Sequence, residues 1–328
     1  MSGMRSEEFN PIKWLSEKLE KISMGEYIRQ IEANFDKEEL YKAHTWTPLK
    51  LIALMYWLTV YSRIVPKRFS NCWYIDLLAS SGANVITETG DIILGSPLLS
   101  YLVPYEPFKH HIFVELDSQK QKTLDRMLKH FGLSDYDILK GDCNEKVHDI
   151  PFSDIDHYFC FIDCEGLDVK MSTLEYLLRY RGDVLLVFQT SSVNRVFGKA
   201  KRGGYNMRAL DDFCGGDWWQ SCSDIEDLLN KYISSVKQKT DSSRGFENFV
   251  DHVRIKGKGG GFIYEVILIC RKGDYIRAWL DLKKKLEALE DEDVKIALKI
   301  CKGELRMLDE FFGQTAFRQT KLDSFLGR

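Results

Sequence analysis

The eight cysteines of this 328-residue chain include no Cys-x-x-Cys pair, and there are only seven prolines. The cysteine spacing therefore gives no indication of a zinc ribbon or of a secreted disulfide framework. We interpret the cysteines mostly as small buried hydrophobic residues. Because 44% of the residues are hydrophobic, the chain can bury enough apolar surface to fold, which excludes a disordered protein.

The sequence also lacks a strong charge of one sign and a long hydrophobic run. Its 46 basic and 49 acidic side chains leave a net charge of -3, so any contact with nucleic acid must be a local patch. The longest apolar runs, such as residues 51–61, are shorter than the roughly 20 residues that span a bilayer. No signal-peptide core follows the charged N-terminus. We therefore expect no membrane association and an intracellular, cytoplasmic protein.

Four regions can be distinguished from the hydrophobic pattern. Apolar residues recur at helical spacing near the N-terminus, short apolar runs alternate with helices in the middle, and helical segments rich in Lys, Glu and Leu follow. The predicted regions are a helical N-terminal extension (1–70), a central domain of alternating strands and helices (71–272), a C-terminal helical segment (273–313) and a flexible polar tail (314–328).

The middle region predicts an α/β fold with a mostly parallel sheet. Continuous apolar runs that are each followed by a helix are typical of strands buried on both faces of such a sheet. These runs are residues 72–78, 111–116, 136–139, 158–162 and 184–188. Residues 249–255 and 262–270 flank a glycine-rich turn with no room for a helix, so they predict a hairpin. A parallel sheet closed by an antiparallel pair predicts a Rossmann-like methyltransferase fold with N- and C-terminal helical additions.

Acidic side chains follow four of the predicted strands. Asp76 and Glu115 end the first two, Asp142 follows the third, and Asp163 ends the fourth. Because the carboxyl ends of parallel strands meet at one edge, where ligands bind in open α/β folds, we expect these acids to converge there. Small residues after Asp76, ending at Gly82, would let a ligand approach the backbone.

Several of these segments together resemble the three-Cys-motif partner family, over roughly residues 44–270. The resemblance is carried by residues 44–50 (HTWTPLK), 74–82 (YIDLLASSG), 95–99 (GSPLL), 113–117 (FVELD), 141–144 (GDCN) and 162–166 (IDCEG). That family is similar to class I S-adenosylmethionine (SAM)-dependent methyltransferases, and its members are predicted to act on nucleic acid. The resemblance implies that Asp76 and Gly82 line the methionine end of SAM, that Glu115 binds its ribose, that Asp142 binds its adenine, and that Asp163 faces the reaction site.

Two positions depart from the pattern of that family. Ser80 stands where the family typically has glycine, at a backbone position that favours a positive φ or a close approach. Cys164 and Glu165 replace the proline and aromatic residue that cradle a flipped base in amino-methylating enzymes, so adenine N6 chemistry is not supported. Cys164 is flanked by two acids, which would raise the pKa of its thiol, so we interpret it as structural and not as a nucleophile.

A cluster of cations follows the fifth predicted strand. Arg195, Lys199, Lys201 and Arg202 precede a glycine pair and predict a basic loop at the substrate edge of the sheet. Such a loop would bind the phosphates of a nucleic acid, although an ordinary solvated loop has the same composition.

The last residues have the spacing of a PIP box, the motif that binds sliding clamps of the PCNA type. Gln319, Leu322, Phe325 and Leu326 occupy the Gln-x-x-aliphatic-x-x-aromatic-aromatic positions, with Leu326 where a second aromatic is common. One tight helical turn would place Leu322, Phe325 and Leu326 on a single side, ready to fill an apolar pocket. The alternative is a final turn that docks on its own domain.

The leading hypothesis is a SAM-dependent methyltransferase that acts on nucleic acid, with no metal-binding residues named, and that is recruited to the chromosome by a PCNA-type sliding clamp. One alternative is a non-catalytic, clamp-binding adaptor that keeps the methyltransferase fold. Another is a nuclease that holds magnesium through Asp76, Glu115 and Asp163, because clustered carboxylates also suit that ion.

Overall fold

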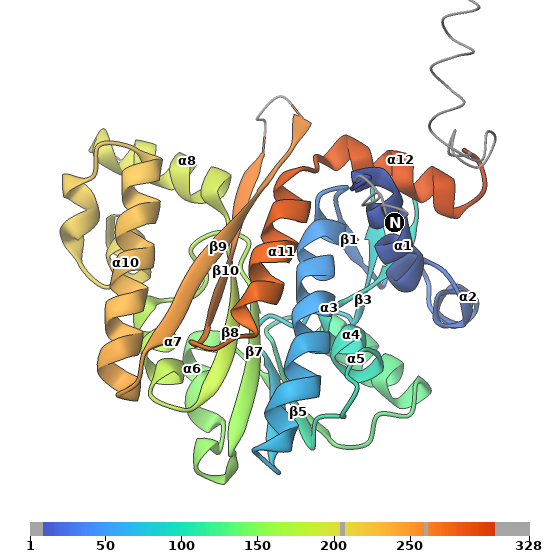
Figure 1. Ribbon diagram of the computed structural model, residues 1–328, viewed down its shortest axis with the longest axis horizontal. Helices are drawn as coiled ribbons and strands as arrows, with labels where there is room; N and C mark the ends of the chain where they lie inside the picture. The colour runs from blue at the N-terminus through green and yellow to red at the C-terminus, as the bar shows by residue number, and fades with distance from the viewer. Residues whose placement is uncertain (1–8, 204–206, 259–261, 306–328) are drawn as a thin grey trace, which may run out of the picture.

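The computed structural model describes residues 9–203, 207–258 and 262–305 of the chain. Its centre is a seven-stranded sheet flanked by helices on both faces (Figure 1). Helix α10 (Ile225–Arg244) lies on one side, and helices α3 (Thr47–Ile64) and α11 (Ile276–Glu287) lie on the other. In spatial order, the strands are β6 (Tyr136–Lys140), β5 (His110–Glu115), β2 (Cys72–Asp76), β7 (His157–Asp163), β8 (Gly182–Phe188), β10 (Ile263–Arg271) and β9 (Asn248–Lys256).

The strand order confirms the predicted fold class. When the seven strands of this sheet are renumbered from 1 to 7 in chain order, their order across the sheet is 3-2-1-4-5-7-6. The first five are parallel, and β10 runs antiparallel to both of its neighbours, β8 and β9. This is the arrangement of the Rossmann-like methyltransferase fold, with a switch in strand order at β2 that opens a crevice for ligands.

The central strands are buried on both faces, so consecutive residues contribute to two separate cores. In β7, Phe159 and Phe161 pack in one core, while Cys160 and Ile162 pack in the other. This follows from the period of two in a strand, and it explains why the runs are apolar throughout.

One core is covered by helices from both ends of the chain. These helices are α1 (Pro11–Ser23), α2 (Glu26–Asn34), α3 (Thr47–Ile64), α4 (Ser96–Leu102), α5 (Ser118–His130), α11 (Ile276–Glu287) and α12 (Asp291–Cys301). The helical spacing near the N-terminus is divided between α1 and α2, because Gly25, with a φ of 89°, ends the continuous helix between them. Helix α3 is apolar and buried on nearly all sides.

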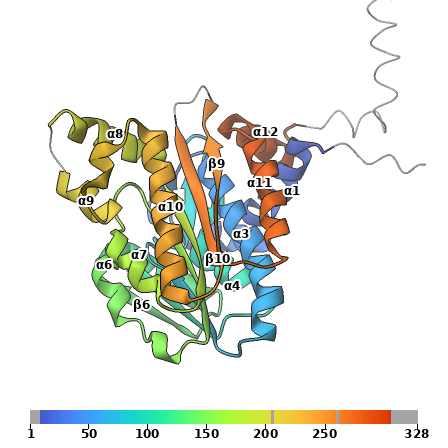
Figure 2. The same cartoon turned by 60° about the vertical axis from the view of Figure 1, so that its left-hand side comes forward.

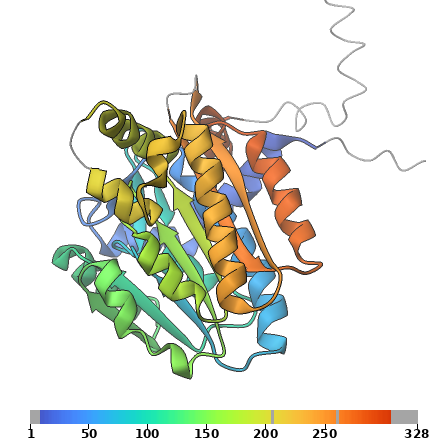
Figure 3. The same ribbon diagram turned by 90° about the vertical axis from the view of Figure 1, so that its left-hand side faces the viewer.

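The other core is covered by helices from the middle of the chain. They are α6 (Cys143–Lys146), α7 (Met171–Leu178), α8 (Thr190–Lys201), α9 (Met207–Cys214) and α10 (Ile225–Arg244). Figure 2 shows α8 and α9 beside one end of α10, and Figure 3 shows α10 lying across the face of the sheet. The prediction of a basic loop over residues 195–202 is wrong for most of its length, because this segment belongs to α8.

A second, three-stranded sheet was not predicted. It consists of β1 (Tyr41–Ala43), β3 (Ala83–Ile86) and β4 (Ile92–Leu94), in the order β1-β3-β4. Strand β1 pairs in parallel with β3, which begins directly after Gly82. This small sheet therefore brings the chain before α3 next to the loop that follows β2.

None of the helices in the described part of the chain is both long and apolar enough to cross a membrane.

Candidate functional site

A cavity of about 250 Å³ lies at the carboxyl ends of β2, β5 and β7, next to the switch in strand order. Of the residues predicted to bind the cofactor or face the reaction site, Gly82, Glu115 and Asp163 line this cavity. Its other lining residues are Tyr41, Thr47, Lys50, Leu51, Leu78, Ala79, Ser80, Asn84, Gly95, Ser96, Leu116, Lys120, Glu165 and Asp168.

Asp76 lies beside this cavity but is completely buried and does not line it. Its carboxylate accepts hydrogen bonds from the Tyr74 hydroxyl (3.2 Å) and from the Leu78 N–H (3.3 Å). Burial raises the pKa of Asp76 to about 7 because the charged form is desolvated. The structure therefore gives Asp76 a role in shaping the turn after β2, and a ligand in the cavity would not reach it directly.

Glu115 fixes the loop that follows β2. One of its carboxylate oxygens accepts the N–H of Ser80 at 2.8 Å, and the other accepts the N–H of Asp117 at 2.8 Å. Ser80 has a φ of 58°, so a serine here adopts the left-handed backbone that favours glycine. Its hydroxyl oxygen is buried and finds no hydrogen-bond partner among the described residues. Ser80 lines the cavity, but its hydroxyl oxygen is enclosed, so a ligand would reach this oxygen only if the loop moved.

Gly82 and Gly95 allow close packing beneath this loop. A Cβ atom on Gly95 would lie 2.6 Å from the Gly82 carbonyl oxygen, which already accepts the Gly95 N–H at 2.9 Å. At Gly82, with φ 92°, a Cβ would lie 3.0 Å from the Met127 sulfur of α5. The two glycines therefore hold the small sheet and α5 close to the cavity.

Asp163 is paired with a lysine that the sequence did not single out. Lys50 Nζ lies 2.7 Å from Oδ1 and 2.6 Å from Oδ2 of Asp163. The side chains are only 9% and 22% exposed, so the lysine of α3 neutralises most of the charge that Asp163 brings to the cavity. A lysine on an otherwise apolar helix was the available signal, because such a charge needs a partner when the helix is buried.

A second polar contact links the small sheet to the loop after β7. The Tyr41 hydroxyl donates a hydrogen bond to Glu165, and burial, followed by this contact, raises the pKa of Tyr41 above its usual range. Asp168 accepts the N–H groups of Glu165 (2.7 Å) and Gly166 (3.0 Å), which fixes the turn. The Lys120 ammonium lies 5.0 Å from the centre of the Tyr41 ring.

Asp142 lies at the same edge of the sheet but outside the cavity lining. It is exposed and caps α6 by accepting the backbone N–H of Asn144 at 2.8 Å. Asn144 in turn donates its side-chain amide to the Asp168 carbonyl at 2.8 Å. This chain of contacts couples Asp142 to the turn after β7.

Cys164 is 2% exposed, and burial raises the pKa of its thiol well above the usual range. Both properties oppose formation of a thiolate, which supports the structural interpretation of this residue.

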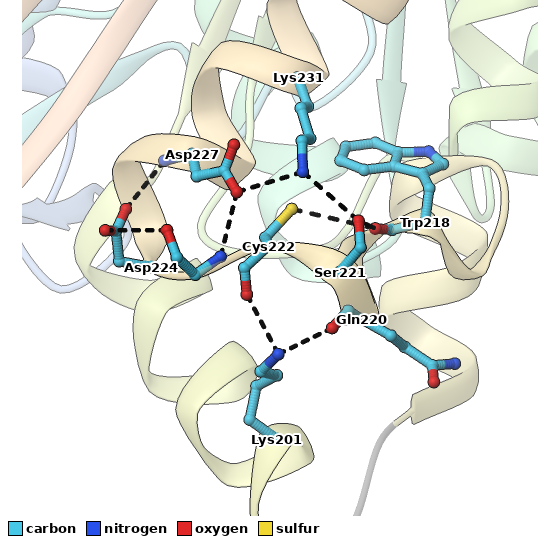
Figure 4. Close-up of polar contacts among 9 residues, drawn as sticks. Lys201, Trp218, Gln220, Ser221, Cys222, Asp224, Asp227 and Lys231 are labelled. Atoms are coloured by element: carbon cyan, nitrogen blue, oxygen red, sulfur yellow. Dashed lines mark hydrogen bonds and ion pairs between the residues drawn. The ribbon is translucent and has the colours of Figure 1, made fainter.

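The four predicted phosphate-binding cations are not equivalent. Arg195, Lys199 and Arg202 are exposed on α8 or at its end. Lys201 is exposed as well, but its ammonium donates hydrogen bonds to the carbonyl oxygens of Gln220 (2.7 Å) and Cys222 (3.1 Å), as Figure 4 shows. It thereby holds the end of the 3₁₀ helix η4 (Asp217–Ser221) against α8, which is a structural role.

The described residues contain no group of three or more His, Cys, Asp or Glu side chains placed to hold a metal ion. Of the acids named for a magnesium site, Asp76 is buried outside the cavity and Asp163 is paired with Lys50. The arrangement therefore gives no support to the nuclease alternative. The predicted clamp-binding residues, Gln319, Leu322, Phe325 and Leu326, lie outside the described residues.

Comparisons with known proteins give distant structural similarities. No protein-family description and no curated protein sequence matches the chain. Among solved structures, it is similar to protein LPL1258 of Legionella pneumophila (11% identity, 71% of this chain and 88% of that one, TM-score 0.45). It is also similar to the methyltransferase PaMTH1 of Podospora anserina, solved with SAH bound (12% identity, 83% and 100%, TM-score 0.41). A third is Trm1 of Pyrococcus horikoshii, solved with SAM (10% identity, 67% and 54%, TM-score 0.38). The fold assignment itself rests on the strand order.

The lining of the cavity suits the polar groups of SAM. It includes four carboxylates and two lysines, an acidic balance that favours a sulfonium cation. Glu115 can accept hydrogen bonds from hydroxyl groups, and the 69% exposed Leu116 offers an apolar surface. The volume is below the roughly 300–1,000 Å³ of most small-molecule sites, so binding of a whole SAM molecule would require the cavity to widen.

Proposed function

We propose that this chain is a SAM-dependent methyltransferase that acts on nucleic acid. The observation that carries the proposal is the acidic cavity at the switch in strand order, where Glu115 ends a parallel strand and accepts the backbone N–H of Ser80 from the loop after β2. The resemblance of the sequence to the three-Cys-motif partner family and the exposed cations of α8 support nucleic acid as the substrate.

The residues of the cavity have separate roles in this proposal. Glu115 accepts hydrogen bonds from the ribose hydroxyls, while it continues to hold the Ser80 and Asp117 N–H groups. Bound SAM supplies an activated methyl group. Asp163 and Glu165 favour the positive charge of the cofactor, and Lys50 limits the excess of negative charge so that the substrate can approach.

Calorimetric titration with SAM tests the proposal. We expect micromolar binding to the wild-type chain and at least a roughly tenfold loss in Glu115→Gln, since an amide cannot accept both N–H bonds and also bind ribose. Glu145→Gln is the matched control, because Glu145 is exposed on α6 and does not line the cavity. Absence of heat at millimolar SAM would overturn the proposal. If SAM binds, transfer of a labelled methyl group to single-stranded and duplex DNA and RNA identifies the substrate.

A non-catalytic adaptor is the second candidate function. It is favoured by the small volume of the cavity and by the Lys50–Asp163 and Tyr41–Glu165 contacts, which already engage polar groups that a catalyst would use. An adaptor would bind its partners without SAM, so the same titration separates the two candidates.

We also propose that the tail binds a PCNA-type sliding clamp through Gln319, Leu322, Phe325 and Leu326. This part of the proposal rests on the spacing of the motif. In surface plasmon resonance with an immobilised clamp, Phe325→Ala should abolish binding of the full-length chain, because an anchor residue is lost. Phe317→Ala, a matched change outside the motif, should not. A drop in thermal stability of Phe325→Ala with binding intact would contradict the proposal.

A further inference from the structure

Three aromatic rings from two distant segments form a continuous stack beside the cavity. The ring centres of His44 and Trp46 are 4.4 Å apart with an angle of 21° between the planes. Those of Trp46 and Phe262 are 4.2 Å apart with an angle of 19°. Nearly parallel stacking of this kind leaves flat ring faces at the ends of the stack.

The stack is fixed to the wall of the cavity. Tyr41 and Thr47 both line the cavity, and His44 and Trp46 lie between them in the chain. The hydroxyl of the buried Tyr264 donates a hydrogen bond to the Trp46 carbonyl at 2.7 Å, and this tyrosine contacts Phe262 with its ring, 5.3 Å between centres. The aromatic surface thus runs from the fully buried Tyr264 to the exposed His44, whose backbone N–H donates to the hydroxyl of the cavity-lining Thr47 at 3.3 Å.

The outer ring of the stack is exposed and yet held in place. His44 has 51% of its side-chain surface exposed, and its Nδ1 lies 2.8 Å from Glu88 Oε1 and 3.4 Å from the Thr87 hydroxyl. These contacts restrict rotation of a ring that contributes little to the core. The His44 ring is therefore already ordered before a ligand binds. Stacking of another planar ring on it then costs less side-chain conformational entropy.

We propose that His44, Trp46 and Phe262 form a stacking platform for an unpaired base of single-stranded nucleic acid, next to the base that enters the cavity. This inference rests on the proposed function, because it names the form of the substrate for the same site. All bases have a flat face, so the platform accepts them with little sequence preference. The exposed Lys42, two residues before His44, is available to a neighbouring phosphate.

Fluorescence anisotropy with a labelled single-stranded oligonucleotide, and with the duplex of the same sequence, tests the platform. His44→Ala should weaken binding of the single strand by roughly 5- to 100-fold, as expected for loss of one stacked base. His44→Phe should restore it, because the flat ring returns. His148→Ala is the matched control: His148 is also exposed and packs against an aromatic ring, Tyr176, but lies on the other face of the sheet.

Three results would overturn the platform: no binding of the single strand by the wild-type chain, equal binding of the duplex, or binding by His44→Ala within twofold of wild type. Failure of His44→Phe to restore binding would also contradict it, because stacking would then not be the cause. Calorimetry with SAM on His44→Ala keeps the two proposals apart. Cofactor binding that is unchanged while the oligonucleotide result is negative removes the platform and leaves the proposed methyltransferase intact.

Discussion

Ser80 holds a backbone conformation that costs a serine free energy. Its φ of 58° lies in the left-handed region, which costs an L-residue roughly 1–2 kcal/mol, and its hydroxyl is buried without a partner among the described residues. We therefore predict that Ser80→Gly raises the free energy of unfolding by about 1 kcal/mol, after the greater flexibility of glycine in the unfolded chain is subtracted. Urea denaturation measures this difference.

The neighbouring serine provides the control for this prediction. Ser81 is buried, accepts the Tyr41 N–H at 3.0 Å and donates to the Ala83 carbonyl at 3.2 Å. Ser81→Gly should therefore destabilise the protein. A Ser80→Gly variant that is no more stable than wild type would show that the left-handed conformation is not strained.

At the scale of residues, the sequence predicted which acids lie near the cavity better than it predicted their partners. Glu115 and Asp163 line the cavity as expected, because both end buried parallel strands. The Lys50 partner of Asp163 is 113 residues away in the chain, and nothing local specifies that contact. The position of Asp76 outside the lining also depends on the packed turn and not on the strand that precedes it.

At the scale of elements, helix α8 was predictable from a signal that its charges obscured. Val193, Phe197 and Ala200 recur at helical spacing, and all three are buried. The cations between them occupy the exposed face, so the segment is an amphipathic helix and not a loop. The distribution of charge around a helix, and not the number of charges, distinguishes these two interpretations.

The small sheet is an element that hydrophobic pattern could not predict. Its strands have only three or four residues, too few to establish a period of two. Strand β1 pairs with β3 across about 40 residues of chain, as Tyr41 opposite Asn84 illustrates. Such pairing is decided by tertiary packing, and it places Tyr41 at the cavity and His44 against Thr87 and Glu88.

At the scale of the whole molecule, the fold was predictable because the central sheet is buried on both faces. Strands β2, β5, β7 and β8 then show as mostly apolar runs, and the glycine-rich turn marks the reversed strand. The same burial encloses polar groups within the layers. Asp76, Asp183 and Glu265 lie on β2, β8 and β10, and burial raises the pKa of each carboxyl group to about 7.

These buried acids link stability to pH in a direction opposite to that of two buried histidines. The folded state binds more protons than the unfolded state on each acid between about pH 4 and 7, so their contribution to stability falls as the pH rises. Burial lowers the pKa of His111 to about 4 and that of His157 to about 3, so their contribution rises with pH up to about 6.5. The pH profile of the wild-type chain is therefore a sum of opposing terms, and a variant is needed to separate them.

Asp183→Asn isolates the contribution of one buried acid, because asparagine does not titrate. In the native chain the Trp57 indole nitrogen donates to Asp183 Oδ2 at 3.1 Å, and the amide oxygen of asparagine can still accept this bond. We predict that the stability of wild type relative to this variant falls between about pH 4 and 7, by at most about 1.4 kcal/mol per pH unit. Urea denaturation across this range measures the difference.

Asp156→Asn is the control with the opposite sign, because hydrogen bonds from the Asn71 N–H and from Ser70 lower the pKa of Asp156. Wild type should therefore gain stability relative to Asp156→Asn as the pH rises through the acid range. A flat or rising difference for Asp183→Asn would mean that Asp183 is ionised in the folded core, and that solvent or a neighbouring cation such as Arg244 compensates its charge.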